Sequence, residues 1–498
     1  MLATAALSTL WLLVFPTAGT DLSAQIARAD FAQRYPHSAY DFSWYAGIYP
    51  AAYSVLAPYV FAFGGTRMVT AVSAVVCAGT LTLLMVRHGI ARPRLAALWV
   101  AAGLWTGLIS GRATFTLGIA AGVAAVAVVD LRWPSRVPTL IVGGILAALA
   151  TLFSPVAGVF VGVGAAALLL TGRRMDGLVL GAAAGVPLLA SAVLFGTSGV
   201  QPMAYFNSGP ALISAALLFM IAPRDWKVVR VGALVYGLGV IMTWIVPTGL
   251  GSNVERLPML VVGPLIIATT GTLGRRRPLF IFAIVGIVVW QAVSPLRDLT
   301  HSDAPLTNAA SATPLVSELV RLRADRARVE AVPQYGHWEA LQLSNTVPLA
   351  RGWERQLDTV RNPLFYSGQL TPDKYHEWLR HNAVGYVAIS TAQPDYAAAT
   401  EAEIVRAGQP WLTPVWHDAN WQLYRVSGTR PLASAPATVV RTNPAGITLK
   451  MARAGSTVVR VRWSRFLRVN GGAQLHRDHD WTRITVPKSG EYRLSAGY

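Results

Sequence analysis

The chain has 498 residues, and a composition of 53% hydrophobic with only 13% charged residues excludes a protein that is soluble throughout. A net charge of +18 would point to nucleic acid in a soluble protein, but before residue 296 most basic side chains lie in short loops between apolar runs. This arrangement follows the positive-inside rule of membrane proteins, so we expect no nucleic-acid partner. A basic face that binds nucleic acid stays an alternative only for the C-terminal part.

Eleven apolar runs before residue 296 predict about eleven transmembrane helices. They lie at 2–18, 68–86, 95–110, 113–130, 137–153, 155–171, 177–196, 208–222, 231–248, 257–273 and 279–295. Every second loop is basic and is expected to face the cytoplasm. The residues that mark these loops are Arg87, Arg92, Arg94, Arg132, Arg136, Arg173, Arg174, Arg224, Lys227, Arg230, Arg275, Arg276 and Arg277. Because the number of spans is odd, everything after Pro295 is expected outside the plasma membrane.

The segment Gly19–Gly64 is expected outside as well, and at about 45 residues it is far longer than a connector between two helices needs to be. It holds three of the seven acidic residues that precede residue 296, and it mixes them with aromatic side chains. This composition suits a pocket at the membrane surface, although a loop anchored at headgroup level by Trp and Tyr would have the same composition. The apolar run 51–63 is too short to span and is expected to be re-entrant or interfacial.

Asp21 follows the first predicted span directly, where a partly desolvated carboxylate can act as a general base or a metal ligand. Asp41 and Asp30 lie in the same loop and could complete a carboxylate pair. Two arginines in outward loops, Arg112 and Arg256, break the positive-inside pattern, and a lipid phosphate gripped by guanidinium groups would explain them. Salt bridges, of Arg256 with Glu255 or of Arg112 with an acid of the first loop, are the alternative.

The C-terminal part is predicted to be extracytoplasmic and to combine an α/β domain with a β-rich module. We expect a linker at 297–314, the α/β domain at 315–430 and the β-rich module at 431–498. Expected elements of the α/β domain are helices at 314–329, 370–382 and 395–408 and strands at 328–333, 346–350 and 384–390. Thr371 is the predicted N-cap of the second of these helices, with Pro372 at its first position. Aromatic and polar residues at 349–366 suit either a sugar or the edge of a core.

The whole arrangement resembles the GT-C superfamily of integral membrane glycosyltransferases. The resemblance rests on a first span followed by the external loop GTDLSAQIARADF to YDFSWYAGIYPAAYSVLAPYVFAFGG, on the elements GRATFTLG, SPVAGVF and NVERLP, and on the external C-terminal domain. It is closest to actinobacterial multi-pass proteins whose tail carries ARGWERQLD and NPLFY. The resemblance implies a GT-C-like transmembrane domain at 1–296, with its large first external loop at 19–65.

By that resemblance the protein would transfer a sugar, with inversion, from a polyprenyl-phosphate donor to a cell-envelope glycan or lipid acceptor outside the bacterial plasma membrane. Asp21, with Asp41 as a second carboxylate, would act as base, Arg112 or Arg256 would hold the donor phosphate, and a divalent cation such as Mg or Mn is left open. The loop residues expected near the acceptor are Asp30, Trp44, Tyr45 and Tyr49. A transporter or lipid flippase, or a non-enzymatic envelope-assembly protein, is the alternative.

Overall fold

The computed structural model describes residues 1–15, 19–131, 135–196, 199–201, 203, 205–270, 277–300 and 304–497, and it divides into two compact units. Unit 1 comprises Met1–Leu22 and Ala51–Thr300, and unit 2 comprises Ser23–Pro50 and His301–Tyr498. Residues 23–50, which the sequence analysis assigned to an external loop of the membrane part, thus fold with the C-terminal residues.

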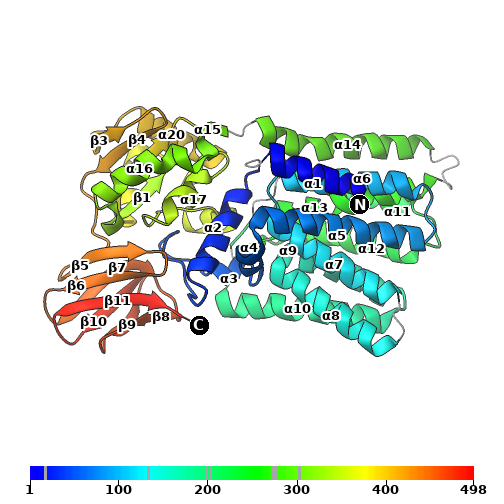
Figure 1. Ribbon diagram of the computed structural model, residues 1–498, viewed down its shortest axis with the longest axis horizontal. Helices are drawn as coiled ribbons and strands as arrows, with labels where there is room; N and C mark the ends of the chain where they lie inside the picture. The colour runs from blue at the N-terminus through cyan, green and yellow to red at the C-terminus, as the bar shows by residue number, and fades with distance from the viewer. Residues whose placement is uncertain are drawn as a thin grey trace. The chain divides into compact units, whose positions relative to one another are not determined.

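Unit 1 is a bundle of apolar helices that lie alongside one another (Figure 1). A helix occupies each range in which a span was predicted. These helices are α1 (Leu2–Val14), α5 (Thr66–Arg87), α6 (Pro93–Ile109), α7 (Ala113–Leu131), α8 (Arg136–Phe153), α9 (Pro155–Leu170), α10 (Arg174–Phe195), α11 (Tyr205–Ile221), α12 (Lys227–Ile245), α13 (Arg256–Ala268) and α14 (Arg277–Thr300).

Among the described residues, six of these helices are long and apolar enough to cross a membrane, namely α5, α7, α8, α10, α12 and α14. The other five are shorter, so a count of about eleven spans stays a prediction. Three arginines used to mark basic loops, Arg132, Arg275 and Arg276, lie outside the described residues.

The apolar run 51–63 forms two short helices, α3 (Pro50–Tyr53) and α4 (Ala57–Gly64), instead of one long helix. Ser54 lies between them and donates its hydroxyl to the carbonyls of Leu152 and Phe153 at the end of α8. These bonds use helix-end carbonyls that have no partner within α8.

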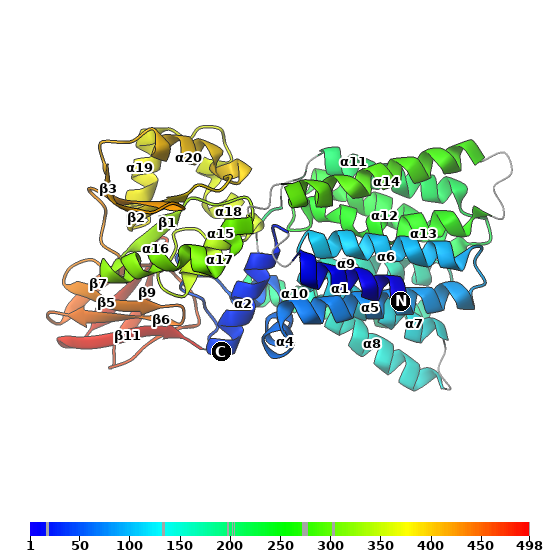
Figure 2. The ribbon, with the colours of Figure 1, turned by 45° about the horizontal axis from the view of Figure 1, so that its top comes forward.

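The first part of unit 2 is a four-stranded sheet in the order β1-β2-β4-β3, in which only β1 and β2 are parallel (Figure 2). Its strands are β1 (Arg328–Ala331), β2 (Val384–Ser390), β3 (Leu412–His417) and β4 (Trp421–Val426). Its helices include α16 (Ala309–Arg321), α17 (Trp338–Ser344), α18 (Arg355–Arg361), α19 (Pro372–His381) and α20 (Ala399–Arg406). Side chains of α16 and α17 form one core with the sheet, and side chains of α19 and α20 form a second core with it.

The second part of unit 2 is a β-rich module made of two antiparallel sheets. Their orders are β7-β10-β9 and β5-β6-β11-β8. The strands are β5 (Ala437–Asn443), β6 (Gly446–Met451), β7 (Gly455–Arg462), β8 (Leu467–Val469), β9 (Gln474–Asp478), β10 (Trp481–Val486) and β11 (Gly490–Ala496). Alternate residues of both sheets, such as Leu449, Val459, Ile484 and Leu494, meet in one core.

Residues 23–50 contribute to both parts of unit 2. They begin within α2 (Leu22–Arg34), and the extended segment after it carries Tyr40 and Phe42 into the core of the β-rich module. Trp44 and Tyr45 enter the core beside α17 instead. Four of the aromatic residues that suggested a pocket at the membrane surface, Tyr40, Phe42, Trp44 and Tyr45, therefore pack inside unit 2, where their exposed fractions are 3% or less.

Several predicted elements of unit 2 are confirmed, and others need correction. The strands at 328–333 and 384–390 are β1 and β2, and the Thr371 hydroxyl accepts a hydrogen bond from the Lys374 N–H at the start of α19. The range 346–350 forms no strand and contributes one bridge, from Leu349 to Val329. The helix predicted at 314–329 starts earlier, at Ala309, and ends at Arg321. In the predicted linker, α14 runs to Thr300 and α15 (Ala304–Thr307) follows residues that lie outside the described ones.

Candidate functional site

The backbone around Asp21 is fixed within unit 1 by two glycines that leave no room for side chains. A Cβ on Gly19 would lie 2.4 Å from the amide nitrogen of Gly111, and a Cβ on Gly111 would lie 2.6 Å from the amide nitrogen of Leu22. Both glycines have positive φ, +101° and +71°, which glycine adopts at the lowest cost. The segment that carries Asp21 is therefore held against the loop that carries Arg112.

Two ion pairs connect these two segments to the start of α13, one from each segment. Nη2 of Arg256 lies 3.4 Å from Oδ2 of Asp21, and Nη2 of Arg112 lies 3.1 Å from Oε1 of Glu255. The sequence suggested a salt bridge of Arg256 with Glu255, or of Arg112 with an acid of the first loop. In the structure the partners are exchanged: Arg256 pairs with Asp21 of the first loop, and Arg112 pairs with Glu255. The structure thus joins three predicted site residues in one place and adds Glu255 as a fourth member.

Arg112 and Arg256 also line one small, partly open pocket in unit 1, whose cavity volume is about 20 Å³. The remaining lining comes from helices α6, α7 and α13 and is almost entirely apolar. It consists of Gly103, Leu104, Thr106, Gly107, Phe115, Thr116, Ile119, Met259 and Leu260. The Arg256 guanidinium lies 5.5 Å from the centre of the Phe115 ring, close enough for a cation–π interaction. Such a pocket offers paired cations beside an apolar wall, which is what the phosphate of a lipid requires.

The four charged side chains are shielded to different degrees. Arg112, Arg256 and Glu255 are 14%, 12% and 9% exposed, whereas Asp21 is 28% exposed. Each arginine engages a carboxylate through one terminal nitrogen, and a guanidinium has five N–H donors in all. Donors therefore remain for an anion, and the Asp21 carboxylate is the most accessible group of the four.

The other predicted site residues belong to unit 2. Asp41 is buried, and its Oδ1 accepts hydrogen bonds from the amide and the hydroxyl of Ser43 at 2.8 and 2.6 Å. Burial raises the pKa of Asp41 to about 6 in spite of these bonds. Asp30 lies 3.9 Å from Arg34 on α2 and is half-buried, and this burial raises its pKa although the charge of Arg34 opposes the shift.

The three aromatic residues predicted near an acceptor have packing roles. Trp44 donates to the carbonyl of Ala340, Tyr45 donates to the carbonyl of Gly352, and Tyr49 packs edge-on against Phe466. A contact of these rings with an acceptor stays a prediction, and it is not part of the proposal below.

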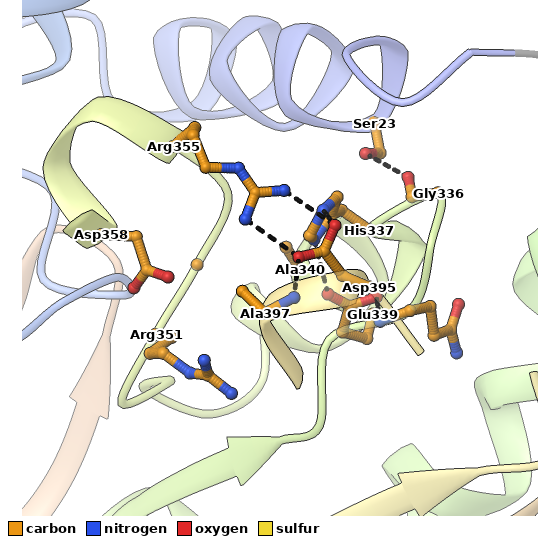
Figure 3. Close-up of polar contacts among 12 residues, drawn as sticks. Ser23, Gly336, His337, Glu339, Ala340, Arg351, Arg355, Asp358, Asp395 and Ala397 are labelled. Carbon is orange, nitrogen blue, oxygen red and sulfur yellow. Dashed lines mark hydrogen bonds and ion pairs between the residues drawn. The ribbon is translucent and has the colours of Figure 1, made fainter. Parts of the chain in front are cut away.

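Unit 2 contains a second polar cluster, around Asp395 (Figure 3). Arg355 donates to both oxygens of Asp395 at 2.9 and 2.7 Å, and the ring of His337, stacked on Trp353, has a nitrogen 3.6 Å from Asp395. Burial opposes ionisation of Asp395, but His337 and Arg355 outweigh it and hold the pKa of this carboxyl well below its usual range. His337 and Asp395 are almost fully buried, so we assign the cluster to the framework of unit 2.

The range 349–366 also belongs to this framework. Arg351 bridges the buried carboxylates of Glu330 and Glu401, and Glu354 accepts a 2.7 Å hydrogen bond from Arg28 of α2. Of the two interpretations of this range, the structure supports the edge of a core.

The sequence leaves a divalent cation open, and such a cation would need carboxylate or other polar side chains gathered as ligands. Among the residues that the structure describes, no group of three His, Cys, Asp or Glu side chains is arranged so that it could hold a metal ion. The two carboxylates beside the pocket face guanidinium groups, which are unfavourable neighbours for a cation. These residues therefore do not fit a bound divalent cation.

Sequence reasoning found the charged residues but missed the apolar wall beside them. The signal was present in the spacing. Phe115, Thr116 and Ile119 follow Arg112 at the intervals of one helix face, and Met259 and Leu260 follow Arg256 in the same way. An arginine at a helix start with apolar residues three and four positions later therefore indicates one face that carries both features.

No protein-family model matches the chain, and no curated protein matches it. Among solved structures, it is similar to two structures of the arabinofuranosyltransferase AftD from Mycobacteria, one of them a mutant, at 13% identity and TM-scores of 0.45 and 0.46. These matches cover 100% of this chain but 59% and 57% of the AftD chains. The chain is also similar to the Archaeoglobus fulgidus oligosaccharyltransferase in complex with Zn and sulfate, at 11% identity and a TM-score of 0.45, over 78% of this chain and 67% of that one.

Proposed function

We propose that the protein is a membrane glycosyltransferase that moves a sugar from a polyprenyl-phosphate donor to a hydroxyl of a cell-envelope glycan or lipid. One observation carries the proposal: Arg112 and Arg256 line a single apolar pocket, and the carboxylate of Asp21 lies at the edge of that arrangement, 3.4 Å from Arg256.

The donor phosphate binds between the two guanidinium groups. Planar guanidinium donors match the geometry of phosphate oxygens, and hydrogen bonds to charged groups are stronger where water is excluded. The polyprenyl chain leaves along Leu104, Ile119 and Leu260, where its burial removes apolar surface from water.

The Asp21 carboxylate acts as general base. It takes the proton of the acceptor hydroxyl as the acceptor oxygen forms a bond to the anomeric carbon of the sugar. The bond from that carbon to the phosphate oxygen breaks, and its electron pair leaves with polyprenyl phosphate, whose negative charge the arginines stabilise. A single displacement of this kind inverts the configuration at the anomeric carbon.

Binding of the donor tests the role of the arginines. Arg112→Lys and Arg256→Lys keep the charge but lose the planar fork, so we expect donor affinity to fall by about 1–3 kcal/mol, or about 5- to 150-fold. The corresponding alanine variants should bind more weakly still. Arg94→Ala removes an exposed arginine at the start of α6 and serves as the control. Titration of the purified variants with a polyprenyl-phosphate sugar measures these affinities.

Product formation tests the base. Asp21→Asn is nearly isosteric, so we expect donor binding to persist while sugar transfer is lost, and Asp225→Asn, at an exposed aspartate, should transfer normally. Full transfer by Asp21→Asn would remove Asp21 from the mechanism and return attention to Asp41 or Asp30. Donor binding by the parent without any transfer would favour a lipid flippase, and no binding at all would favour an envelope-assembly protein.

A further inference from the structure

The β-rich module carries a strong excess of positive charge. Residues 431–498 contain eleven Lys and Arg but only three Asp and Glu. Two of the three acids neutralise arginines near the sheet β7-β10-β9: Asp478 lies 2.6 Å from Arg483, and Asp480 lies 3.7 Å from Arg462. Nine basic residues and one acid of the module lie outside these two pairs.

The outer face of the sheet β5-β6-β11-β8 carries much of that charge. Ile447, Leu449 and Leu494 point into the core, so the residues that alternate with them point outward. Arg441 on β5 and Arg493 on β11 both pair in register with Thr448 of β6, and Arg468 on β8 pairs with Ser495 of β11. The three arginines thus lie on one face, with Arg441 and Arg493 about 10 Å apart because β6 separates their strands.

These arginines are exposed, and no carboxylate of the described residues pairs with any of the three. The third acid of the module, Glu491, stands opposite Lys450 in the register of β11 and β6. Two hydroxyl residues, Thr448 and Ser495, lie between the arginines. The face is consequently polar and positive.

We propose that this outer face binds an acidic polysaccharide. Guanidinium groups pair with carboxylates or phosphates of the polymer, while Thr448 and Ser495 can hydrogen-bond to its hydroxyls. A bilayer is a poorer fit, because docking at a membrane surface uses apolar side chains and those of this sheet point into the core. Single-stranded nucleic acid fits poorly too, because the residues that alternate outward include no aromatic ring for a base to stack on. The proposal goes beyond sugar transfer, since such a face can hold a polymer whether or not the pocket in unit 1 acts on it.

The test is a titration of the full chain in discs of zwitterionic lipid with polygalacturonate, with neutral dextran as the reference polymer. The face variant combines Arg441→Gln, Arg468→Gln and Arg493→Gln. A matched variant with the same loss of charge combines Arg453→Gln, Arg477→Gln and Lys488→Gln at exposed positions of the same module. Equal melting temperatures of parent and variants establish that both variants fold.

We expect the parent to bind polygalacturonate and not dextran, with an affinity that falls as salt screens the charges. The face variant should bind about tenfold more weakly, since each exposed ion pair contributes a factor of roughly 1.5 to 5, and the matched variant should bind like the parent. Equal loss in both variants would overturn the proposal, because it would show attraction by net charge alone. Binding to phosphatidylglycerol vesicles that depends on the same arginines, without binding to polygalacturonate, would overturn it in favour of a lipid surface.

Discussion

Gly111→Ala should disrupt the proposed site without touching any charged group. The new Cβ would lie 2.6 Å from the amide nitrogen and 2.9 Å from the Cβ of Leu22, and relief of these contacts requires a shift of roughly 0.8–1 Å. The residue that must move follows Asp21 directly. A displacement of about 1 Å at a reacting group can lower a rate by about 100-fold.

A second glycine serves as a control that separates the loss of stability caused by alanine at positive φ from the effect of displacing Leu22. Gly89 also has positive φ, +57°, but a Cβ there meets no atom within 4 Å. Gly89→Ala should therefore lower the free energy of unfolding by about 1–2 kcal/mol, the cost of holding alanine at positive φ. Gly111→Ala should lower it by the same amount and by about 1–3 kcal/mol more, because the new methyl group overpacks against Leu22.

The assay combines denaturant unfolding of the purified variants in detergent with the rate of sugar transfer at saturating donor. Gly89→Ala should transfer like the parent, and Gly111→Ala should be slower by about two orders of magnitude. If Gly111→Ala were as active as Gly89→Ala, the close approach of residues 19–22 to Gly111 would not position the base, and the reasoning would fail.

Three further outcomes are expected. Arg351→Met leaves the buried carboxylates of Glu330 and Glu401 without their cation and should lower the free energy of unfolding by about 3–5 kcal/mol, whereas Arg380→Met, at an exposed pair with Glu377, should change it by less than about 1 kcal/mol in the same denaturant titration. Asp41 has a pKa of about 6 in the folded chain, above its unfolded value, so its contribution to the free energy of unfolding is present at low pH and is lost as pH rises through about 6. Asp41→Asn should remove this pH-dependent loss, raise the free energy of unfolding at pH 7 by up to about 3 kcal/mol and leave sugar transfer intact. Unfolding curves of parent and variant between pH 4 and 8 test this, and equal curves would contradict it. A reporter that is active only outside the cytoplasm, fused after Tyr498, should be active, and activity of a cytoplasmic reporter there would reverse the predicted topology.

Hydropathy located the helices of unit 1 well because each helix is a continuous apolar run that can be identified from neighbouring residues alone. The partners of residues 23–50 are not local. Tyr45 donates to Gly352, about 300 residues further on, and the amide of Arg462 donates to the carbonyl of Ala46. No periodicity within the segment reveals such contacts, so its aromatic residues suggested an exposed pocket, although Tyr40, Phe42, Trp44 and Tyr45 belong to the core.

The sheet of unit 2 illustrates a different limit. Strand β2 is a run of buried apolar residues and was predicted at its observed bounds, whereas β3 was missed because Pro414 interrupts a stretch of only six residues. Proline is tolerated in β3 because the strand lies at the edge of the sheet, and the register shifts between Pro414 and Trp416. An edge position is a property of the sheet order, which the sequence does not contain.

The ion pairs of the candidate site were half predictable for a similar reason. Their residue types follow from two arginines that break a charge pattern, but their pairing depends on how three loops meet. The observed pairing, Arg112 with Glu255 and Arg256 with Asp21, gives the two ion pairs different roles. Arg112 and Glu255 form the shorter and more buried pair, which costs most to break and so anchors the loop before α7 to the start of α13. Arg256 and Asp21 form the longer pair, and Asp21 is its more exposed member. A long, partly solvated pair can open when phosphate reaches Arg256, and its opening would leave the Asp21 carboxylate free for the acceptor hydroxyl at the moment the donor is bound.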